Sequence, residues 1–174
     1  MQSILAGYVL KKSERERLER LYGYRIIEDY EKVGAFQHIV GMAAHVFGVP
    51  VALVNFVDRE KVLTRSCVGY ENLTEVDRGV SICSLAILRD QVTVFEDAQQ
   101  DPCLLGNPFV YGEFGLQFYA AAPLRTPDGY NIGVLAVADR KPRRFSPEDA
   151  LLLEGLAALV MEELEARKQR LVRM

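Results

Sequence analysis

The stretch Phe118–Val160, FYAAAPLRTPDGYNIGVLAVADRKPRRFSPEDALLLEGLAALV, decides the fold of this chain. Small and apolar residues alternate over residues 117–124 and again over 131–138, and Thr126-Pro127-Asp128-Gly129 separates the two runs. Proline presets φ at the second position of a turn, and glycine tolerates the last position. The pattern therefore predicts two antiparallel strands joined by a hairpin.

A strongly capped helix is predicted after this hairpin. Ser146 offers its hydroxyl as an N-cap, and Pro147 suits the first helical position. The acidic residues that come next, Glu148 and Asp149, face the positive end of the helix dipole. These signals predict a helix that begins at Pro147.

The same helix carries a heptad seam. Its members follow one another in steps of three and four: Ala157, Val160, Leu164, Arg167 and Leu171. Such spacing is typical of helices that pair, so we predict that the apolar members of the seam form a homodimer with a second copy. Leu153 and Leu156 are expected to pack on the domain itself. Past Leu164 nearly every residue is charged, and residues 166–174 are expected to project as a solvated end.

The first half of the chain predicts the other elements of one α+β domain. Ser13 followed by Glu16 is a capping-box pattern, which indicates a helical lead-in over residues 1–25. Apolar residues at helical spacing predict a second helix, Gly34–Phe47, that ends at Gly48. The elements expected after it are strands at 51–57 and 61–69, a short helix at 82–88 and a short strand at 91–95.

Composition and charge narrow the class of protein. The chain has 174 residues, of which 49% are hydrophobic, enough for one domain with a substantial core. A net charge of −3 and the lack of a basic stripe argue against nucleic acid as a partner. No apolar run approaches the ~20 residues that span a bilayer, and the first residues do not resemble a secretion signal. We therefore expect a cytoplasmic protein without a membrane partner.

Cysteine and histidine spacing gives no sign of a metal site. Cys67, Cys83 and Cys103 are widely separated and form no CxxC pair, which indicates neither a zinc site nor a disulfide framework. His38 and His45 share one side of the predicted helix, without a thiol or carboxylate at ligand spacing. The sequence leaves any cofactor unknown.

Taken in order, these features resemble the GAF domain family. Members carry a segment of the type FYAGAPL-TPDG-GTL-V-D-PR-FSPEQ-LL--LA-LV, and residues 48–59 resemble their GVPVALVSLVD-ER segment. The resemblance implies an α+β, PAS-like fold in which a central antiparallel sheet of five to six strands has helices on one face. A loop-rich segment would cover the other face. The domain would span residues 26–165.

The resemblance also implies a sensory or dimerisation module, because GAF domains are rarely enzymes. The loop-rich middle, Tyr70–Gly115, would form a small-molecule pocket over the sheet. Side chains of two strands would make its floor, and an arginine could pair an anionic ligand if it faces the pocket. A thiol in the first turn of a short helix would meet the positive end of the helix dipole, which lowers a thiol pKa, but we expect Cys83 to be a small buried residue. The candidate ligand-binding residues are Phe56, Arg65, Cys83, Phe109, Phe118 and Ala120.

Two alternatives stay open. In one, the domain is a pure dimerisation scaffold whose pocket is filled by its own side chains. The side chains expected to fill it are Ile82, Leu85, Phe109 and Tyr119. In the other, the chain is similar to free methionine-(R)-sulfoxide reductases, GAF proteins that use one cysteine as nucleophile and another as resolver. Cys83 would then pair with Cys103 or with Cys67. The GKGVCG segment of those enzymes is absent, since residues 79–84 read GVSICS.

We therefore predict a non-catalytic sensory or regulatory domain that binds an unidentified small molecule, dimerises through its terminal helices, or does both. Ligand binding would reshape the middle loops, and the sheet would transmit the change to the last helix. Family members often continue into a histidine kinase or a diguanylate cyclase. This sequence contains neither, so a signalling partner in trans is expected unless the chain is a piece of a longer sensor.

Overall fold

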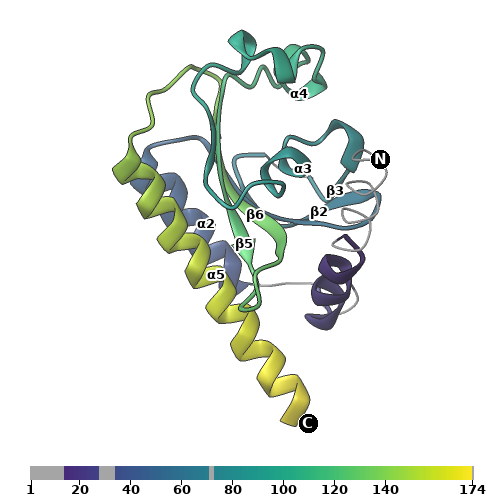
Figure 1. Ribbon diagram of the computed structural model, residues 1–174. Helices are drawn as coiled ribbons and strands as arrows, with labels where there is room; N and C mark the ends of the chain where they lie inside the picture. Colours follow the sequence, from purple (N-terminus) through teal and green to yellow (C-terminus); the bar gives the residue numbers. More distant parts are fainter. Residues whose placement is uncertain (1–13, 28–33, 71–72, 174) are drawn as a thin grey trace.

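The computed structural model describes residues 14–27, 34–70 and 73–173. These residues form a six-stranded antiparallel sheet with two long helices on one face and a segment of short elements over the other (Figure 1). The α+β fold is therefore confirmed. Ser13, the predicted N-cap of the lead-in, lies outside the described residues. Residues 14–23 are helical, and we call them the leading helix.

The sheet has the strand order β3-β2-β1-β6-β5-β4, so β1 and β6 lie at its centre. All its pairings are antiparallel. The strands are β1 Val51–Val57, β2 Lys61–Val68, β3 Glu75–Asp77, β4 Thr93–Phe95, β5 Phe118–Arg125 and β6 Asn131–Asp139. Only β3 was not predicted, because three residues with one apolar side chain among them show no alternation.

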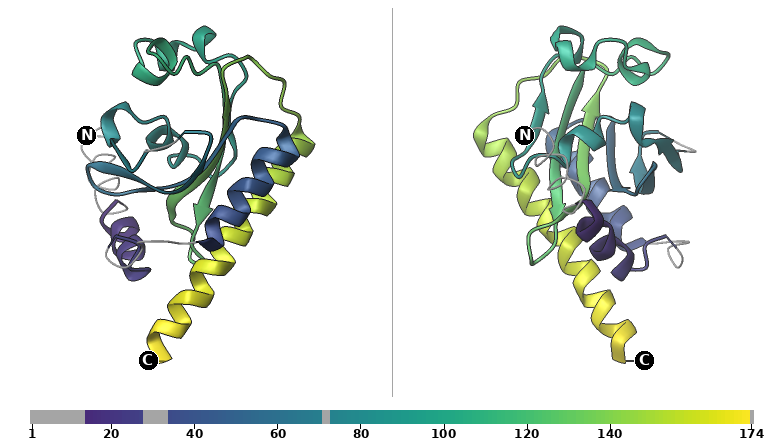
Figure 2. Two further views of the ribbon diagram at one scale, coloured as in Figure 1. Left: turned by 180° about the vertical axis from the view of Figure 1, so that it is seen from behind. Right: turned by 45° about the vertical axis from the view of Figure 1, so that its right-hand side comes forward.

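Two long helices, α2 (Gly34–Phe47) and α5 (Pro147–Arg173), pack side by side on one face of the sheet (Figures 1 and 2). The other face is covered by short elements, which we call the covering segment. These are η1 Arg78–Val80, α3 Cys83–Ala86, η2 Ala98–Gln100, η3 Pro102–Leu104 and α4 Pro108–Tyr111. The end of α5 projects beyond the sheet (Figure 2). Among the described helices, none is long and apolar enough to cross a bilayer.

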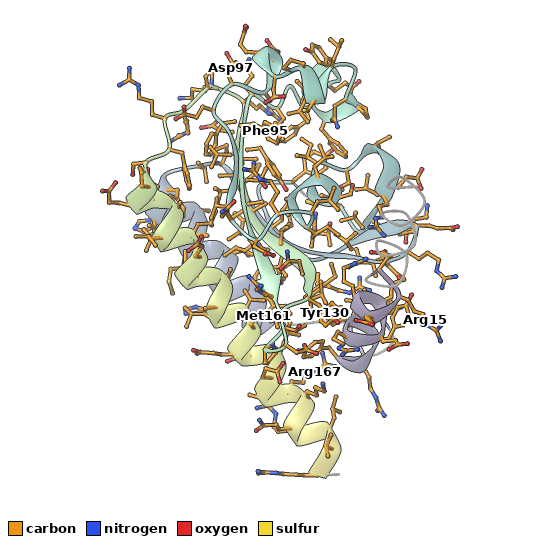
Figure 3. The ribbon with its side chains drawn as sticks, in the orientation of Figure 1. Arg15, Phe95, Asp97, Tyr130, Met161 and Arg167 are labelled. Atoms are coloured by element: carbon orange, nitrogen blue, oxygen red, sulfur yellow. The ribbon has the colours of Figure 1, made fainter. Side chains whose placement is uncertain are left out.

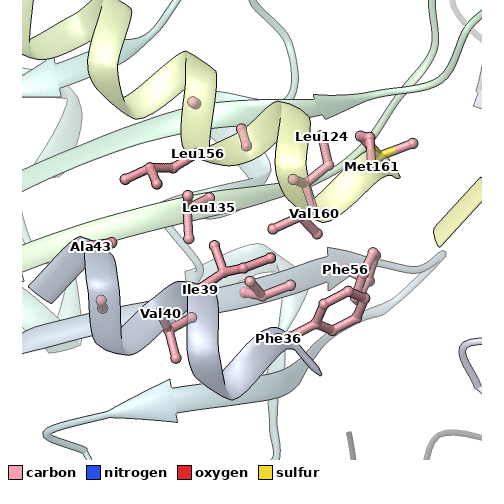
Figure 4. Close-up of a cluster of buried hydrophobic side chains, with 14 of the residues drawn as sticks. Phe36, Ile39, Val40, Ala43, Phe56, Leu124, Leu135, Leu156, Val160 and Met161 are labelled. Carbon is pink, nitrogen blue, oxygen red and sulfur yellow. The ribbon is translucent and has the colours of Figure 1, made fainter. Parts of the chain in front are cut away.

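Strand alternation gives the sheet two apolar faces, because successive side chains point to opposite sides. On the helix face, Phe56 of β1 packs against Phe36 of α2, with ring centroids 6.3 Å apart, and shares a core with Val160 of α5 (Figure 4). On the covered face, Tyr119 of β5 shares a second core with Ile82 of the covering segment. Burial on both faces explains why β1 reads as an almost continuous apolar run.

Local signals fix the ends of both long helices. Asp149 N–H donates to Ser146 Oγ at 3.1 Å, and Ser146 N–H donates to Asp149 Oδ2 at 2.9 Å, which completes a capping box at the start of α5. Helix α2 ends at Gly48, whose φ of 62° places it in the left-handed region. Val49 N–H donates to the Ala44 carbonyl at 3.0 Å, which closes the last turn. Both ends lie where the sequence predicts them.

The leading helix is bound to the sheet and to the covering segment. The buried Arg17 guanidinium donates to the Val57 carbonyl at the end of β1, at 2.7 Å, and to Glu14 at 2.8 Å. Glu14 also accepts a hydrogen bond from Arg78 of η1, at 2.5 Å. One carboxylate therefore bridges an arginine of the leading helix and an arginine of the covering segment.

The leading helix also contacts the β5–β6 hairpin, and the turn after it contacts α5. Tyr130, which lies next to the leading helix in Figure 3, donates a hydrogen bond to Glu16. Tyr24 donates to Glu165 of α5, and the Lys168 ammonium lies 4.9 Å from the centre of the Tyr24 ring. These contacts join the leading helix to the β5–β6 hairpin and the turn after the leading helix to α5.

Candidate functional site

A cavity of about 70 Å³ lies between the covered face of the sheet and the covering segment. Strands β1, β5 and β6 supply its floor. On β6, Ala136 and Ala138 line it with single methyl groups, so the space above them is not filled. Other lining residues are Leu53, Asn55, Ile82, Cys83, Phe109 and Tyr119. None of the described residues that line the cavity carries a charged side chain.

Three polar side chains meet at the cavity, two from its floor and one from the covering segment. The Cys83 thiol at the start of α3 accepts hydrogen bonds from the Asn55 amide of β1, at 3.3 Å, and from the Tyr119 hydroxyl of β5, at 3.1 Å. All three side chains are buried. The Asn55 Oδ1 atom has no hydrogen-bond partner among the described residues. The floor therefore contains a small polar cluster with one acceptor unused.

This cluster is neutral at physiological pH. Burial raises the pKa of the Cys83 thiol, and the hydrogen bonds from Tyr119 and Asn55 only partly oppose that rise. Burial also raises the pKa of Tyr119 well above its ordinary value. Burial of Cys83 confirms the expectation of a small buried residue and disfavours a thiol activated by the helix dipole. Helix α3 has only four residues, and desolvation of the thiolate outweighs so short a dipole.

The structure brings two of the predicted site residues together. Cys83 and Phe109 both line the cavity, from α3 and α4. Whether they bind a ligand stays a prediction. Ile82 and Tyr119, expected to fill the space in the scaffold alternative, line it as well, whereas Leu85 is exposed.

Three other candidates lie on the wrong face of the sheet for this cavity. Phe56, Phe118 and Ala120 are buried in the core beneath α2 and α5. The sequence pattern correctly predicted which side chains of each strand share a face. It assigned these side chains to the covered face, whereas they lie on the face that packs against α2 and α5. Because strand side chains alternate with a period of two, the residues that do line the cavity are their neighbours, such as Asn55 and Tyr119.

Arg65 does not face the cavity either. It occupies the irregularity in the β1–β2 ladder, where Val54 pairs with Ser66 and Asn55 pairs with Thr64. Its Nε donates to the Ile26 carbonyl at 3.1 Å, and burial lowers its pKa. The predicted contact between Arg65 and an anionic ligand is therefore corrected: this arginine anchors the chain after the leading helix.

Asn55 is a site residue that the sequence pattern missed, and Tyr119 was expected only to fill the space, without a hydrogen-bonding role. Asn55 is the single polar residue of the buried strand VALVNFV, and that was the available signal. A buried amide needs hydrogen-bond partners, so its presence in a central strand points to a polar group on the layer above. Tyr119 gave no such signal, because tyrosine is common in strands of any kind.

The three cysteines occupy different environments. Cys83 is buried, Cys67 is half-buried on β2, and Cys103 is exposed in η3. Burial raises the pKa of the Cys67 thiol, which donates to the Tyr70 carbonyl at 3.5 Å. All three are free thiols. Within the described residues, no cluster of histidine, cysteine and acidic side chains is arranged to hold a metal ion.

The predicted dimer seam of α5 faces the domain itself. Ala157, Val160 and Leu164 are buried in the core that α5 forms with the sheet and α2, and Leu171 is half-buried. The three buried residues cannot also pair with a second copy, so the assignment of the face is wrong for them, whereas pairing through Leu171 stays a prediction. The buried residues of the seam and Leu153 lie on one apolar stripe of α5. This stripe packs on the core, as the apolar face of an amphipathic helix usually does.

Other apolar side chains of the two long helices are exposed. On α5 they include Leu152 and Leu159, seven residues apart and thus on one side of the helix. On α2 they are Met42 and Val46, four residues apart. The two helices lie side by side, and each of them exposes apolar side chains to solvent.

Comparison with known proteins identifies relatives of the whole domain. The family model described as GAF domain matches residues 33–164. A cyclic di-GMP phosphodiesterase of Pseudomonas aeruginosa is 38% identical over 130 residues, which are 74% of this chain and 22% of that protein. The chain therefore spans about a fifth of the length of this curated relative.

Solved structures share the fold. A free methionine-R-sulfoxide reductase from Neisseria meningitidis in complex with its substrate has a TM-score of 0.66 and 21% identity, over 90% of this chain and 91% of that chain. The GAF domain of an Acinetobacter phosphoenolpyruvate-protein phosphotransferase has a TM-score of 0.63 and 16% identity, over 91% and 98%. At these identities the likeness concerns the fold alone.

Proposed function

Because this chain belongs to the GAF domain family, we propose that it is a cytoplasmic sensory module that binds a small molecule in the cavity over β1, β5 and β6. The observation that carries the proposal is the cavity itself, which has apolar walls and a few polar groups gathered on its floor. Sites for small molecules are typically built in this way. The module has no catalytic activity of its own in this proposal.

The state of the cysteines supports a non-catalytic role. Reduction of a sulfoxide by thiols needs a reactive thiolate and then a resolving thiol. The Cys83 thiol is buried, hydrogen-bonded and held in its protonated form, while Cys103 is exposed. Incubation with free methionine-(R)-sulfoxide and dithiothreitol should therefore leave the sulfoxide unchanged. Turnover that a Cys83→Ser variant abolishes would favour the reductase instead.

In this proposal, a ligand in the cavity can shift the leading helix through a chain of hydrogen bonds. Ser81 and Cys83 line the cavity, and the Ser84 hydroxyl that follows donates to the carbonyls of Ser81 and Arg78, each at 2.6 Å. The Arg78 guanidinium binds Glu14 of the leading helix at 2.5 Å. A ligand that displaces Ser81 would therefore shift the leading helix. This route adds to the one expected through the sheet and α5.

The proposed output is a change in how two copies pair, or in how the module contacts a signalling partner in trans. Pairing would use the exposed apolar side chains of α2 and α5 in place of the buried seam. The similarity to about a fifth of a cyclic di-GMP phosphodiesterase supports a regulatory role within a signalling system. The catalytic activity of that relative is not proposed for this chain.

Native mass spectrometry of the full chain, purified from cell extract, tests the proposal. We expect a retained small molecule whose removal lowers the melting temperature, and whose addition restores it, because a ligand bound only to the folded state stabilises that state. Replacing Ala136 by Phe should fill the cavity and remove the ligand. A chain that never carries a ligand and melts at the same temperature as Ala136→Phe would favour the dimerisation scaffold.

A further inference from the structure

We propose that the cavity binds a molecule that combines an aromatic ring with one carboxylate, and that the Arg140 guanidinium pairs with this carboxylate at the open side of the cavity. The inference rests on the proposed function, since it takes the cavity as the ligand site. It goes beyond that function by stating the chemical class of the ligand and the residue that recognises its charge. The cavity walls, the position of Arg140 and the charges around the cavity each contribute to it.

The walls of the cavity favour an aromatic ligand. Four aromatic side chains line it: Phe109 of α4, Phe114 after α4, Tyr119 of β5 and Tyr70 after β2. The rings of Tyr70 and Phe114 already meet edge to face, with centroids 5.0 Å apart. On the floor, the two alanines of β6 present only methyl groups. A planar ring placed there can make the edge-to-face and stacked contacts that aromatic rings prefer.

Arg140 lies on the cavity side of the sheet, at the residue that follows β6. Side chains alternate along a strand, so Arg140 continues the row of the two alanines of β6 that line the cavity. Its guanidinium carbon lies 5.0 Å from the centre of the Phe114 ring, and Phe114 lines the cavity as well. The preceding side chain points the other way, because Asp139 pairs with Arg143, which also donates to the Phe47 carbonyl at the end of α2. Arg140 is therefore packed against a wall of the cavity.

The Arg140 guanidinium is available to a carboxylate. Among the described residues it forms no ion pair or hydrogen bond, and it packs against the Phe114 ring. A guanidinium is planar and can bind a carboxylate through two parallel hydrogen bonds. In this proposal Arg140 takes the role that the sequence pattern suggested for Arg65.

The other residues around the cavity place the charge of the ligand at Arg140. No lysine, arginine or acidic side chain is among the described residues that line the cavity. An ion buried deeper would lack a partner of opposite charge, which is strongly unfavourable. The cavity is partly open to solvent, and Arg140 is exposed. The ring therefore lies between the walls while the carboxylate stays at the open side, where one positive charge matches one negative charge.

Three probes separate the ring from the charge. Phenylacetate has both, phenylacetamide has a similar shape without the charge, and acetate has the charge without the ring. Each is titrated into the full chain at neutral pH and low ionic strength, and the amide resonances of the protein are followed by NMR. We expect phenylacetate to bind roughly five-fold more tightly than phenylacetamide, because an exposed pair of charges contributes modestly. Acetate should cause no shifts at the cavity over the same range, and high salt should reduce the preference for phenylacetate.

Three variants locate the preference. Arg140→Gln removes the charge from an exposed position, so phenylacetate and phenylacetamide should bind with similar affinity. Lys141→Gln is the control: it removes the same charge from the next residue, which is also exposed and does not line the cavity. This variant should retain the roughly five-fold preference. Ala136→Phe should weaken the binding of both ring compounds, since it fills the cavity.

The outcomes separate this inference from the proposed function. If phenylacetate and phenylacetamide bind the unsubstituted chain equally well, or if Arg140→Gln keeps the preference, the pairing with Arg140 is wrong although the cavity remains a ligand site. If acetate binds as tightly as phenylacetate, the requirement for an aromatic ring is wrong. If no probe causes shifts at the cavity, the inference fails as a whole, whereas a molecule retained in native mass spectrometry would still support the proposed function.

Discussion

At the scale of single residues, the chemistry of Cys83 is set by burial. The thiol stands at the start of α3, where a longer helix would stabilise a thiolate. Its actual neighbours are apolar walls and two neutral donors, Asn55 and Tyr119, which hold it in a protonated, hydrogen-bonded state. The residue therefore resembles a structural cysteine more than a nucleophile.

Alkylation rates should reflect this difference between thiols. We expect iodoacetamide at neutral pH to modify exposed Cys103 roughly a hundred times faster than Cys83, because Cys83 must await an opening of the covering segment. Mass spectrometry of tryptic peptides over time measures both rates, and half-buried Cys67 should fall between them. Equal rates for Cys83 and Cys103 would contradict the proposed burial and strengthen the reductase alternative.

Glu14 makes the stability of the protein sensitive to acid. Burial raises the pKa of this carboxyl, but hydrogen bonds and charge from Arg17 and Arg78 outweigh burial and lower the pKa from 4.5 to about 2. Because the folded state holds the lower pKa, the stabilisation is full above pH 4.5 and is lost as the pH falls toward 2. Glu14 is partly exposed, so solvent screening reduces its contribution to about 1 kcal/mol.

A Glu14→Gln variant tests this dependence. At neutral pH its free energy of unfolding, measured with urea, should be about 1 kcal/mol lower than that of the unsubstituted chain. This difference should shrink as the pH falls from 4.5 toward 2. Glu113→Gln, a change at an exposed loop residue, serves as the control and should show no such trend. A Glu14 difference that stays constant with pH would rule out the proposed ion pairs.

At the scale of elements, two glycines should respond oppositely to the same substitution. A Cβ on Gly133 of β6 would lie 2.2 Å from the Asn55 carbonyl oxygen of β1, so Gly133→Ala should destabilise the protein by about 2–3 kcal/mol. Gly155 of α5 is exposed and faces open space, so Gly155→Ala should stabilise by up to about 1 kcal/mol. Urea unfolding measures both. A Gly133→Ala variant that is as stable as the unsubstituted chain would disprove the close approach of β1 and β6.

The elements that the sequence predicted well are those with local signals. Helix α2 has a clear apolar period and a terminal glycine, and β1 lies between that glycine and the turn at Asp58-Arg59-Glu60, so both bounds could be predicted. Strand β3 and the 3-10 turns were missed because they span three residues each, less than one period of any pattern. Their positions depend on what they pack against.

At the scale of the whole molecule, the exposed apolar side chains of α2 and α5 predict a homodimer. Leu159 of α5 is 39% exposed although it is fully apolar. We expect the unsubstituted chain to be a dimer by size-exclusion chromatography with light scattering, and Leu159→Glu to be a monomer, because a buried carboxylate without a partner is unfavourable. Val172→Glu should remain dimeric, since Val172 lies at the end of α5, where the helix projects beyond the sheet and away from α2. An unsubstituted chain that is itself a monomer contradicts the prediction.

The sequence by itself determined the order of the longer elements, the hairpin, the start of α5, the end of α2 and the family, because periodicity, caps and turns act between residues close in the chain. It also showed which side chains of a strand share a face. Only the tertiary structure decided which face meets the helices and which meets the cavity, because alternation is symmetric until another layer packs on one side. Likewise, the cluster of Asn55, Cys83 and Tyr119 joins residues 28 and 36 positions apart, and only the sheet and its covering segment bring them together.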